Sequence, residues 1–323
     1  MTVAWVVGAG GLLGRALTNQ LRQTGTRLFS PSPRLAWGEA RLLPDQIAQG
    51  ITAFAHHARQ AGAWELYWAA GITGMGSPKP MIAAELRALQ WFLDRLVGEP
   101  TLREIPGRFL LSSSAGGIYA DTSQTVVDET SPTAPTTPYA WGKLRQEQLV
   151  RQSLLPSLGC RVLLARISTL YGPAHPGDTR QGLITTIARG MVRNQPVPIF
   201  VPLDTIRDYL DSQDAARIGL ASLRSLPVGA DPTLKIIASE RPTTVAEIVA
   251  TFRRVAHRRL LFTTGVGEHS GLYARRFRFH SRVFPELGRL AQTTLLHGVA
   301  RVLAAERQLQ QRPAPPHTPT TGR

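Results

Sequence analysis

Along the first half of the chain, short apolar runs alternate with longer stretches in which apolar side chains recur every three or four residues. The short runs predict buried strands over residues 3–7, 27–29, 65–70, 109–111 and 162–166. The longer stretches predict helices over residues 12–23, 47–59, 81–97 and 139–152. This alternation of strand and helix indicates an α/β fold, and we expect a doubly wound parallel sheet of the Rossmann type.

The pattern becomes less regular after Tyr171. It predicts helices over residues 182–193, 212–225, 244–256 and 287–307 and strands over 197–201 and 234–238, with Thr243 or Thr244 as the N-cap of the third helix. We expect a domain over residues 1–170, a smaller C-terminal lobe over 171–310 and a disordered, proline- and threonine-rich tail over 311–323. Segments 206–225 and 234–240 are expected to return to the first domain.

Composition narrows the classes of partner. The net charge of +15 and the isoelectric point of about 11.2 fit an anionic small molecule, a nucleic acid or an anionic membrane. The basic residues are spread along the chain, with small clusters at 253–254, 258–259 and 275–278. Cys160 is the only cysteine, which excludes an internal disulfide and a cysteine-built metal site, and no apolar run reaches the length of a membrane span. We expect a soluble, cytoplasmic protein without a metal centre.

A glycine-rich segment follows the first predicted strand and opens the first predicted helix. Its spacing is G-x-x-G-x-x-G, which permits a tight turn and the close approach of a pyrophosphate to a helix N-terminus. The segment favours a dinucleotide site over a glycine turn without a ligand. The candidate cofactor contacts are Gly8, Gly10, Gly11, Leu12, Leu13, Gly14, Arg15, Ala69, Ala70 and Gly71.

The end of the second predicted strand bears on the choice of cofactor. An acidic side chain normally binds the ribose 2′-hydroxyl of NAD at this position. The segment from Thr26 to Gly38 contains no Asp or Glu, and it offers Ser30, Ser32 and Arg34 instead. Hydroxyl and guanidinium groups fit a 2′-phosphate, so NADP is the expected cofactor and NAD is the alternative.

Tyr139 and Lys143 stand one helical turn apart in the segment TPYAWGK. A tyrosine phenol has an unperturbed pKa of about 10, and an ammonium group one turn away favours the phenolate. We interpret Tyr139 as a general acid/base and Lys143 as its electrostatic partner, although an isolated pair would also fit an ordinary contact on a helix surface. A hydroxyl after the strand over 109–111, from Ser114 or as second choice Ser113, is expected to polarise the substrate oxygen.

Four segments, taken in this order, resemble the extended short-chain dehydrogenase/reductase family, which includes nucleotide-sugar epimerases, dehydratases and reductases. They are the glycine loop, SSSAGGIY at 112–119, TPYAWGK at 137–143 and ARISTLYGP at 165–173. TIRDYLDSQDAA at 205–216 and FPELGRLAQTTLLHGVARVL at 284–303 extend the resemblance to about residue 305. It implies that Lys143 also holds the nicotinamide ribose and that Thr169, Arg207 and Arg278 contact the substrate.

The resemblance also implies hydride transfer at a carbon of a sugar, with a nucleotide-linked sugar as the expected substrate. Dehydratases of the family carry an acidic pair after the catalytic hydroxyl, whereas Ala115, Gly116 and Gly117 follow Ser114, so we expect a keto-sugar reductase or an epimerase. Thr169 and Glu85 stand where the family usually has asparagine, and VPLDT at 201–205 replaces its Gly-Asp-Gly.

The expected assembly is a homodimer, and neither a nucleic acid nor a membrane is an expected partner. The alternative functions are a non-catalytic NADP-binding regulator and a nucleic-acid-binding protein on a Rossmann fold. The intact Ser–Tyr–Lys set favours the enzyme, because a binding module has no need of it.

Overall fold

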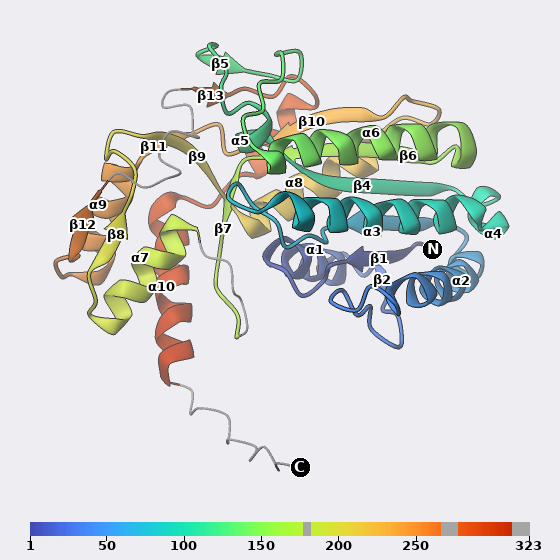
Figure 1. Cartoon of the computed structure of the whole chain (residues 1–323), viewed down its shortest axis with the longest axis horizontal. Helices are drawn as coiled ribbons and strands as arrows, with labels where there is room; N and C mark the ends of the chain where they lie inside the picture. Colours follow the sequence, from blue (N-terminus) through green and yellow to red (C-terminus); the bar gives the residue numbers. More distant parts are fainter. Residues whose placement is uncertain (177–181, 266–276, 312–323) are drawn as a thin grey trace.

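A six-stranded parallel sheet forms the centre of the molecule (Figure 1). The structure is a computed structural model, and it describes residues 1–176, 182–265 and 277–311. The strand order is β10–β6–β4–β3–β1–β2. The bounds of these strands are Val3–Val7 for β1, Arg27–Phe29 for β2, Trp64–Trp68 for β3, Gly107–Ser114 for β4, Arg161–Ile167 for β6 and Thr233–Ile237 for β10.

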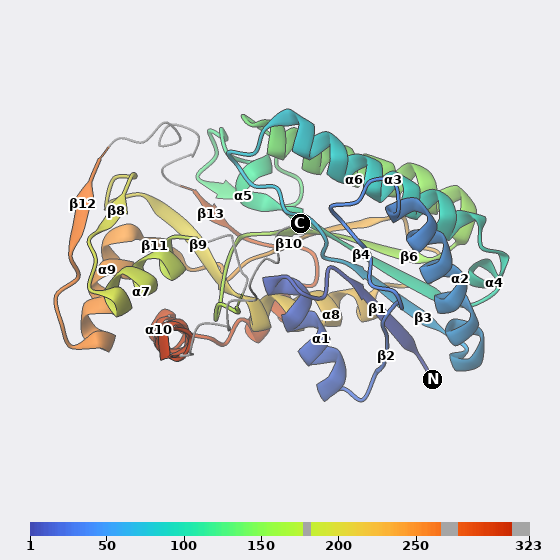
Figure 2. The same cartoon turned by 60° about the horizontal axis from the view of Figure 1, so that its bottom comes forward.

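Successive side chains of each strand enter two different cores. Val3, Trp5 and Val7 of β1 belong to one core, and Ala4 and Val6 belong to the other. The strands read as continuous apolar runs because both faces of the sheet are covered. Figure 2 shows long helices on both faces of the sheet. One face carries α2 (Leu43–Ala61), α3 (Lys79–Gly98) and α6 (Pro138–Leu158), and the other carries α1 (Leu12–Gln23) and α8 (Ser212–Ser225).

The predicted α/β fold with a doubly wound parallel sheet is confirmed. The chain passes from β1 to β2 on one side and then returns to β3 on the other side of β1. In sheets of this kind ligands bind at such a reversal, outside the carboxyl ends of the strands. Among the described residues the sheet ends at β2, whereas the classic Rossmann order has one more strand beyond its second strand.

A smaller lobe lies beside the carboxyl edge of the sheet, and Gly172 at its entrance packs close to Leu12 of the glycine loop. Its core holds buried apolar side chains such as Ile187, Phe252 and Val299. The lobe's helices are α7 (Leu183–Arg193), α9 (Val245–Ala256) and α10 (Leu295–Gln311). Its short strands are β7 (Thr169–Tyr171), β8 (Val197–Ile199), β9 (Ile206–Asp211), β11 (Pro242–Thr244) and β12 (Phe262–Thr264).

The chain leaves the sheet for the lobe after β6, returns with α8 and β10, and enters the lobe again with β11. Helix α8 packs against α1, and β10 pairs with β6 at the edge of the sheet. The proposed domain limits at 170 and 310 stay a prediction. Four further short elements are α4 (Pro100–Arg103), α5 (Ala115–Ile118), β5 (Val126–Val127) and β13 (Arg278–Phe279), of which β5 and β13 pair with each other.

The helix predicted over 287–307 is wrong at its start. A 3₁₀-helix, η2 (Pro285–Leu290), comes first, and α10 begins only at Leu295. The Asp214 carboxylate accepts hydrogen bonds from the backbone N–H and the hydroxyl of Thr293, which fixes the intervening segment in a non-helical conformation. By contrast, Thr244 is the N-cap of α9 and forms a capping box with Glu247.

Two expectations from the sequence concern residues outside the described ranges. They are the tail beyond residue 311 and the arginines Arg275 and Arg276 of the cluster over 275–278. Within the described ranges, no helix is both long and apolar enough to cross a membrane, and no three His, Cys, Asp or Glu side chains gather as metal ligands.

Candidate active site

The glycine loop connects β1 to α1 and turns back tightly on itself. Gly8 has a φ of +89°, and a Cβ there would lie 2.6 Å from the backbone nitrogen of Ala70. A Cβ on Gly14 would overlap the carbonyl oxygen of Gly8. By contrast, a Cβ on Gly10 would have no atom within 4 Å, and Gly11 is the N-cap of α1. The loop therefore needs glycine at two positions for its own packing, while Gly10 leaves open space beside a helix N-terminus.

The remaining candidate cofactor contacts lie on the loops that flank this turn. Ala69, Ala70 and Gly71 follow β3, and the backbone of Ala69 and Ala70 packs against Gly8. Ser30 and Arg34 follow β2 and are exposed, and the Arg15 guanidinium donates a hydrogen bond to the carbonyl oxygen of Gly10. Leu12 and Leu13 begin α1, where Leu13 is buried against the sheet.

Glu85 of α3 fixes the loop after β3. Its carboxylate accepts hydrogen bonds from the backbone N–H groups of Ile72 and Thr73 and from the Thr73 hydroxyl, the last at 2.7 Å. It also lies against Gly71, where a Cβ would be 3.2 Å from a carboxylate oxygen. Glu85 stands where the family usually has asparagine. Its hydrogen bonds show that the carboxylate holds the loop after β3 in place.

Ser114 and Tyr139 meet around Gly117. A Cβ on Gly117 would lie 3.3 Å from Cε1 of Tyr139, 3.4 Å from the Ser114 hydroxyl and 3.4 Å from the sulfur of Met75. Ser114 ends β4, and its hydroxyl accepts a hydrogen bond from the Gly117 N–H at 3.3 Å. Tyr139 lies in the first turn of α6, which Thr137 caps. The absence of a side chain at Gly117 leaves a space that the hydroxyl and the phenol share.

Lys143 lies one turn after Tyr139 on α6 and is buried. Its ammonium nitrogen is 5.8 Å from the centroid of the Tyr139 ring. It donates hydrogen bonds to the carbonyl oxygen of Ser112 at 3.3 Å and to the side-chain oxygen of Gln146 at 3.1 Å. These bonds hold a positive charge beneath the phenol, at the carboxyl end of β4.

The structure separates the two candidate serines. The hydroxyl of Ser113 donates a 2.6 Å hydrogen bond to the buried Glu147 carboxylate, so it is directed into the protein interior. Ser114 is the one that approaches Tyr139. The alternation of side chains along β4 explains the difference, since neighbouring residues of a strand point to opposite faces.

Two of the three candidate substrate contacts, Thr169 and Arg207, lie in the lobe, and the third, Arg278, lies in β13. Thr169 of β7 pairs with Tyr209 of β9, two residues from Arg207, so Thr169 and Arg207 lie on one face of that sheet. The Arg207 guanidinium donates to the carbonyl oxygen of Ile206 at 3.0 Å. Arg278 is exposed in β13. This strand pairs with β5 in a separate two-stranded sheet and lies near β9.

Asp208, beside Arg207, ties the lobe to the central sheet. Its carboxylate accepts hydrogen bonds from the hydroxyls of Ser168 and Ser239 and from the Ser239 N–H. Burial raises the pKa of Asp208, and these hydrogen bonds oppose that shift. Two adjacent residues of the segment RDY thus differ in role: Asp208 holds the structure together, and Arg207 is a candidate substrate contact.

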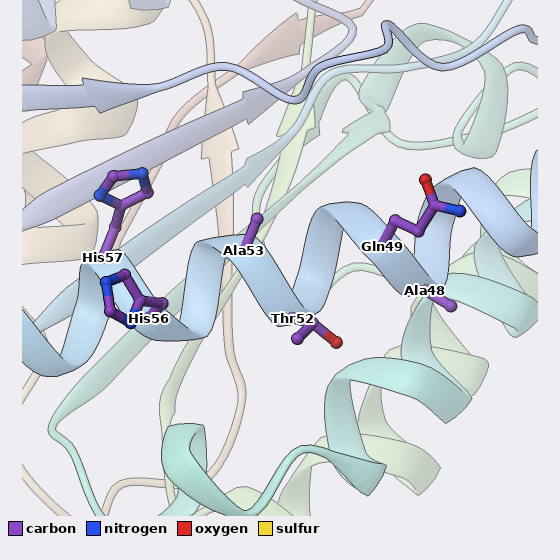
Figure 3. A pocket seen from close by; sticks show the side chains of 6 residues that line it. All are labelled: Ala48, Gln49, Thr52, Ala53, His56 and His57. Atoms are coloured by element: carbon purple, nitrogen blue, oxygen red, sulfur yellow. The ribbon is translucent and has the colours of Figure 1, made fainter.

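A shallow hollow on the outer side of α2 lies away from this site (Figure 3). It is lined by Ala48, Gln49, Thr52, Ala53, His56 and His57. The two histidines come in the last turns of α2, where the chain approaches the amino end of β3, and His57 contacts Arg27 at 2.9 Å. The candidate chemistry is at the opposite, carboxyl edge of the sheet, so we assign the hollow no part in it.

Comparison with known proteins gives consistent results. The model of the NAD dependent epimerase/dehydratase family matches residues 83–234. A UDP-glucose 4-epimerase of Azospirillum brasilense is 27% identical over 213 residues, which are 62% of this chain and 61% of that protein. A dTDP-glucose 4,6-dehydratase of Neisseria meningitidis is 31% identical over 32% of this chain and 29% of its own length. The chain thus matches less than two thirds of either relative.

Two solved structures share the fold over nearly the whole chain. The UDP-glucose 4-epimerase of Thermotoga maritima, solved with UDP-glucose, has a TM-score of 0.76 at 17% identity. RMD from Pseudomonas aeruginosa, solved with NADPH, has a TM-score of 0.73 at 22% identity. Each alignment covers 96% of this chain and 100% of the other.

Proposed function

We propose that this chain, as a member of the extended short-chain dehydrogenase/reductase family of NAD-dependent epimerases and dehydratases, transfers a hydride between a nicotinamide cofactor and a carbon of a nucleotide-linked sugar. The observation that carries the proposal is the convergence of Ser114 and Tyr139 around Gly117, with the Lys143 ammonium beneath the phenol. These groups lie at the carboxyl edge of the sheet that also carries the glycine loop.

In the proposed reaction the chain's residues handle the proton. Oxidation of a sugar carbinol removes a hydride from carbon and a proton from oxygen; the bound nicotinamide supplies the hydride acceptor. Tyr139 takes the proton from the sugar oxygen and returns it in the reverse direction. Lys143 stabilises negative charge on the phenolic oxygen, and the Ser114 hydroxyl donates a hydrogen bond to the sugar oxygen as charge develops there.

Reduction or epimerisation fits the site better than dehydration. Dehydration needs an acid and a base beside the reacting sugar, in addition to Tyr139. The residues after Ser114 are Ala115, Gly116 and Gly117, none of which can transfer a proton. Glu85 reaches the neighbouring loop, but its carboxylate accepts hydrogen bonds from that loop's backbone.

Purified protein with NADPH or NADH, offered nucleotide-linked 4-keto sugars and nucleotide sugars, distinguishes the two reactions. A reductase consumes the reduced cofactor in proportion to product. An epimerase inverts the sugar without net consumption. Elimination of water from the sugar would contradict the preference against dehydration.

For the cofactor, we propose NADP as the preferred form, supported by Ser30 and Arg34 at the end of β2. Replacing Arg34 with alanine is expected to weaken NADPH binding by about tenfold or more, because a charged hydrogen bond to a phosphate is worth about 1.5–3 kcal/mol. NADH binding should change little, since NADH lacks the 2′-phosphate. Titration of both cofactors by fluorescence measures the difference.

Arg22→Ala is the matched control for this measurement, because Arg22 is an exposed arginine in the last turn of α1. It should leave the affinity for both cofactors unchanged. Equal losses of NADPH and NADH affinity in Arg34→Ala would contradict a 2′-phosphate contact and favour NAD.

Substitution of Gly117 by alanine is expected to lower kcat/KM by about tenfold or more, because the added methyl group enters the space between Ser114 and Tyr139. Gly116→Ala is the control, since a Cβ on Gly116 has no atom within 4 Å. Steady-state kinetics of both variants tests this. Equal activity of the two variants would show that the sugar oxygen does not bind in this space.

For the substrate's anionic end, we propose that Arg207 binds a nucleoside diphosphate, with Thr169 on the same face of the small sheet. A planar guanidinium suits a phosphate oxygen pair. Arg278, on the neighbouring β13, is proposed as the second arginine.

A further inference from the structure

A buried network of four side chains lies directly behind the candidate active site. Glu147 of α6 accepts a 2.6 Å hydrogen bond from the Ser113 hydroxyl. Its two carboxylate oxygens bind the Arg166 guanidinium of β6 at 2.9 and 2.7 Å. The same guanidinium donates to the Tyr119 hydroxyl and lies over the Tyr119 ring, 5.2 Å from its centroid. No member is more than 6% exposed.

Three members of the network are close in sequence or space to a residue of the proposed reaction. Ser113 immediately precedes Ser114 at the end of β4. Glu147 lies one turn after Lys143 and two turns after Tyr139 on α6. Tyr119 follows α5, the short helix whose Gly117 N–H binds the Ser114 hydroxyl. The network thus joins β4, α6, β6 and α5 at the point where they present the serine and the tyrosine.

Stability alone is a weak reason for such a network. Burial tends to lower the pKa of Arg166, and hydrogen bonds and charge from Glu147 raise it above the ordinary value, so the ion pair persists. Burying two charges is nevertheless expensive, and apolar side chains of similar volume are often as stable or more so. The ion pair instead contributes geometric specificity. A bidentate carboxylate–guanidinium contact fixes how α6 and β6 lie relative to each other.

We propose that Glu147 and Arg166 are positioning residues that set the separation of Ser114 on β4 from Tyr139 and Lys143 on α6. The proposal rests on the proposed function, since it assigns these two side chains a part in the same hydride-transfer site. Glu147 reaches the reacting groups only through its neighbours on β4 and α6, and it touches neither sugar nor cofactor.

A second network, built around the buried Glu65, provides a close control; its Arg224 is partly exposed, and Arg108 also approaches Glu65 at 3.5 Å. Glu65 binds Arg224 at 3.0 and 2.9 Å and accepts a 2.8 Å hydrogen bond from the Tyr67 hydroxyl. It has the same chemistry of carboxylate, guanidinium and phenol, and Glu65 is 1% exposed. However, Glu65 lies near the amino end of β3, at the opposite edge of the sheet from Ser114.

The deciding experiment replaces each ion pair as a whole. A single change such as Glu147→Gln leaves Arg166 as a buried, unbalanced charge and is expected to destabilise the protein for that reason alone. The paired variant Glu147→Leu with Arg166→Met removes both charges, and Glu65→Leu with Arg224→Met is its control. Melting temperatures of the two paired variants establish that both are folded.

Turnover of the nucleotide sugar on which the wild type is active is then compared. We expect the Glu147/Arg166 variant to lose about 10- to 100-fold in kcat with KM changed by less than about threefold, because a small misplacement of reacting groups slows the chemical step. The Glu65/Arg224 variant should keep its kcat. Equal kcat values for the two paired variants, whether both high or both low, would overturn the positioning role.

A crystal structure of the Glu147/Arg166 variant provides a readout that needs no turnover. The distance between the Tyr139 hydroxyl and the Ser114 hydroxyl should change relative to the wild type, and it should not change in the Glu65/Arg224 variant. An unchanged distance would overturn the proposal. If the wild type transfers no hydride, the proposed function fails, and these crystal structures still decide whether the network positions the two side chains.

Discussion

Tyr139→Phe is expected to lower turnover by about 10²–10⁴-fold, the range that a positioned general acid/base contributes. The substitution removes one oxygen and keeps the ring that packs beside Gly117 and above Lys143. Without the phenolic oxygen, no side chain exchanges a proton with the sugar oxygen during hydride transfer, so the reaction becomes slow. Binding of NADPH or NADH should be unchanged within about twofold, because the glycine loop is intact.

Steady-state kinetics and cofactor titration of the same preparation test this prediction. Tyr67→Phe is the control, because it also removes a phenolic oxygen, here one bound to Glu65 near the amino edge of the sheet. It should retain wild-type turnover. A Tyr139→Phe variant with turnover within about threefold of the wild type would exclude Tyr139 as the proton-transferring group.

Gly14→Ala is expected to abolish measurable cofactor binding and to lower the free energy of unfolding by about 1–3 kcal/mol. The new Cβ would overlap the Gly8 carbonyl oxygen, so the first turn of α1 must move away from β1. The N-terminus of α1 would then no longer face the proposed pyrophosphate site. Cofactor titration and urea unfolding measure the two effects.

Gly10→Ala separates the loop's own packing from the space kept for a ligand. A Cβ on Gly10 meets nothing within 4 Å, so the stability of the protein should be unchanged. If the pyrophosphate passes over Gly10, the added methyl group weakens cofactor binding by about tenfold while leaving the melting temperature as in the wild type.

For the Gly14→Ala variant, full cofactor affinity would contradict the location of the dinucleotide at this loop.

Local sequence patterns were sufficient for the sheet and its long helices. Apolar runs located β1 and β6 to within a residue or two, because strands covered on both faces leave a continuous apolar signal. The short strands β7, β9 and β11 escaped prediction, since none of them is a continuous run of buried apolar residues. The break before α10 was also missed, because it depends on Asp214, a residue almost 80 positions away from Thr293.

The site was predictable in part. Residues four positions apart lie on the same face of a helix, so the proximity of Tyr139 and Lys143 could be inferred from the sequence. Met75 was missed: it comes from the loop after β3 and reaches Gly117 only through the tertiary fold. Glu147 was missed as well, although its place one turn after Lys143 was a usable signal.

Transfer of deuterium from sugar to cofactor tests the central claim most directly. Protein loaded with NADP⁺ or NAD⁺ is mixed with nucleotide sugars deuterated at individual ring carbons, and mass spectrometry of the nicotinamide follows the label. For a nucleotide-sugar reductase or epimerase, we expect deuterium to appear on the nicotinamide from one ring carbon, with Tyr139→Phe strongly slowing its appearance. A cofactor that binds but never receives deuterium would indicate a regulator instead, and failure of both cofactors to bind would contradict the account altogether.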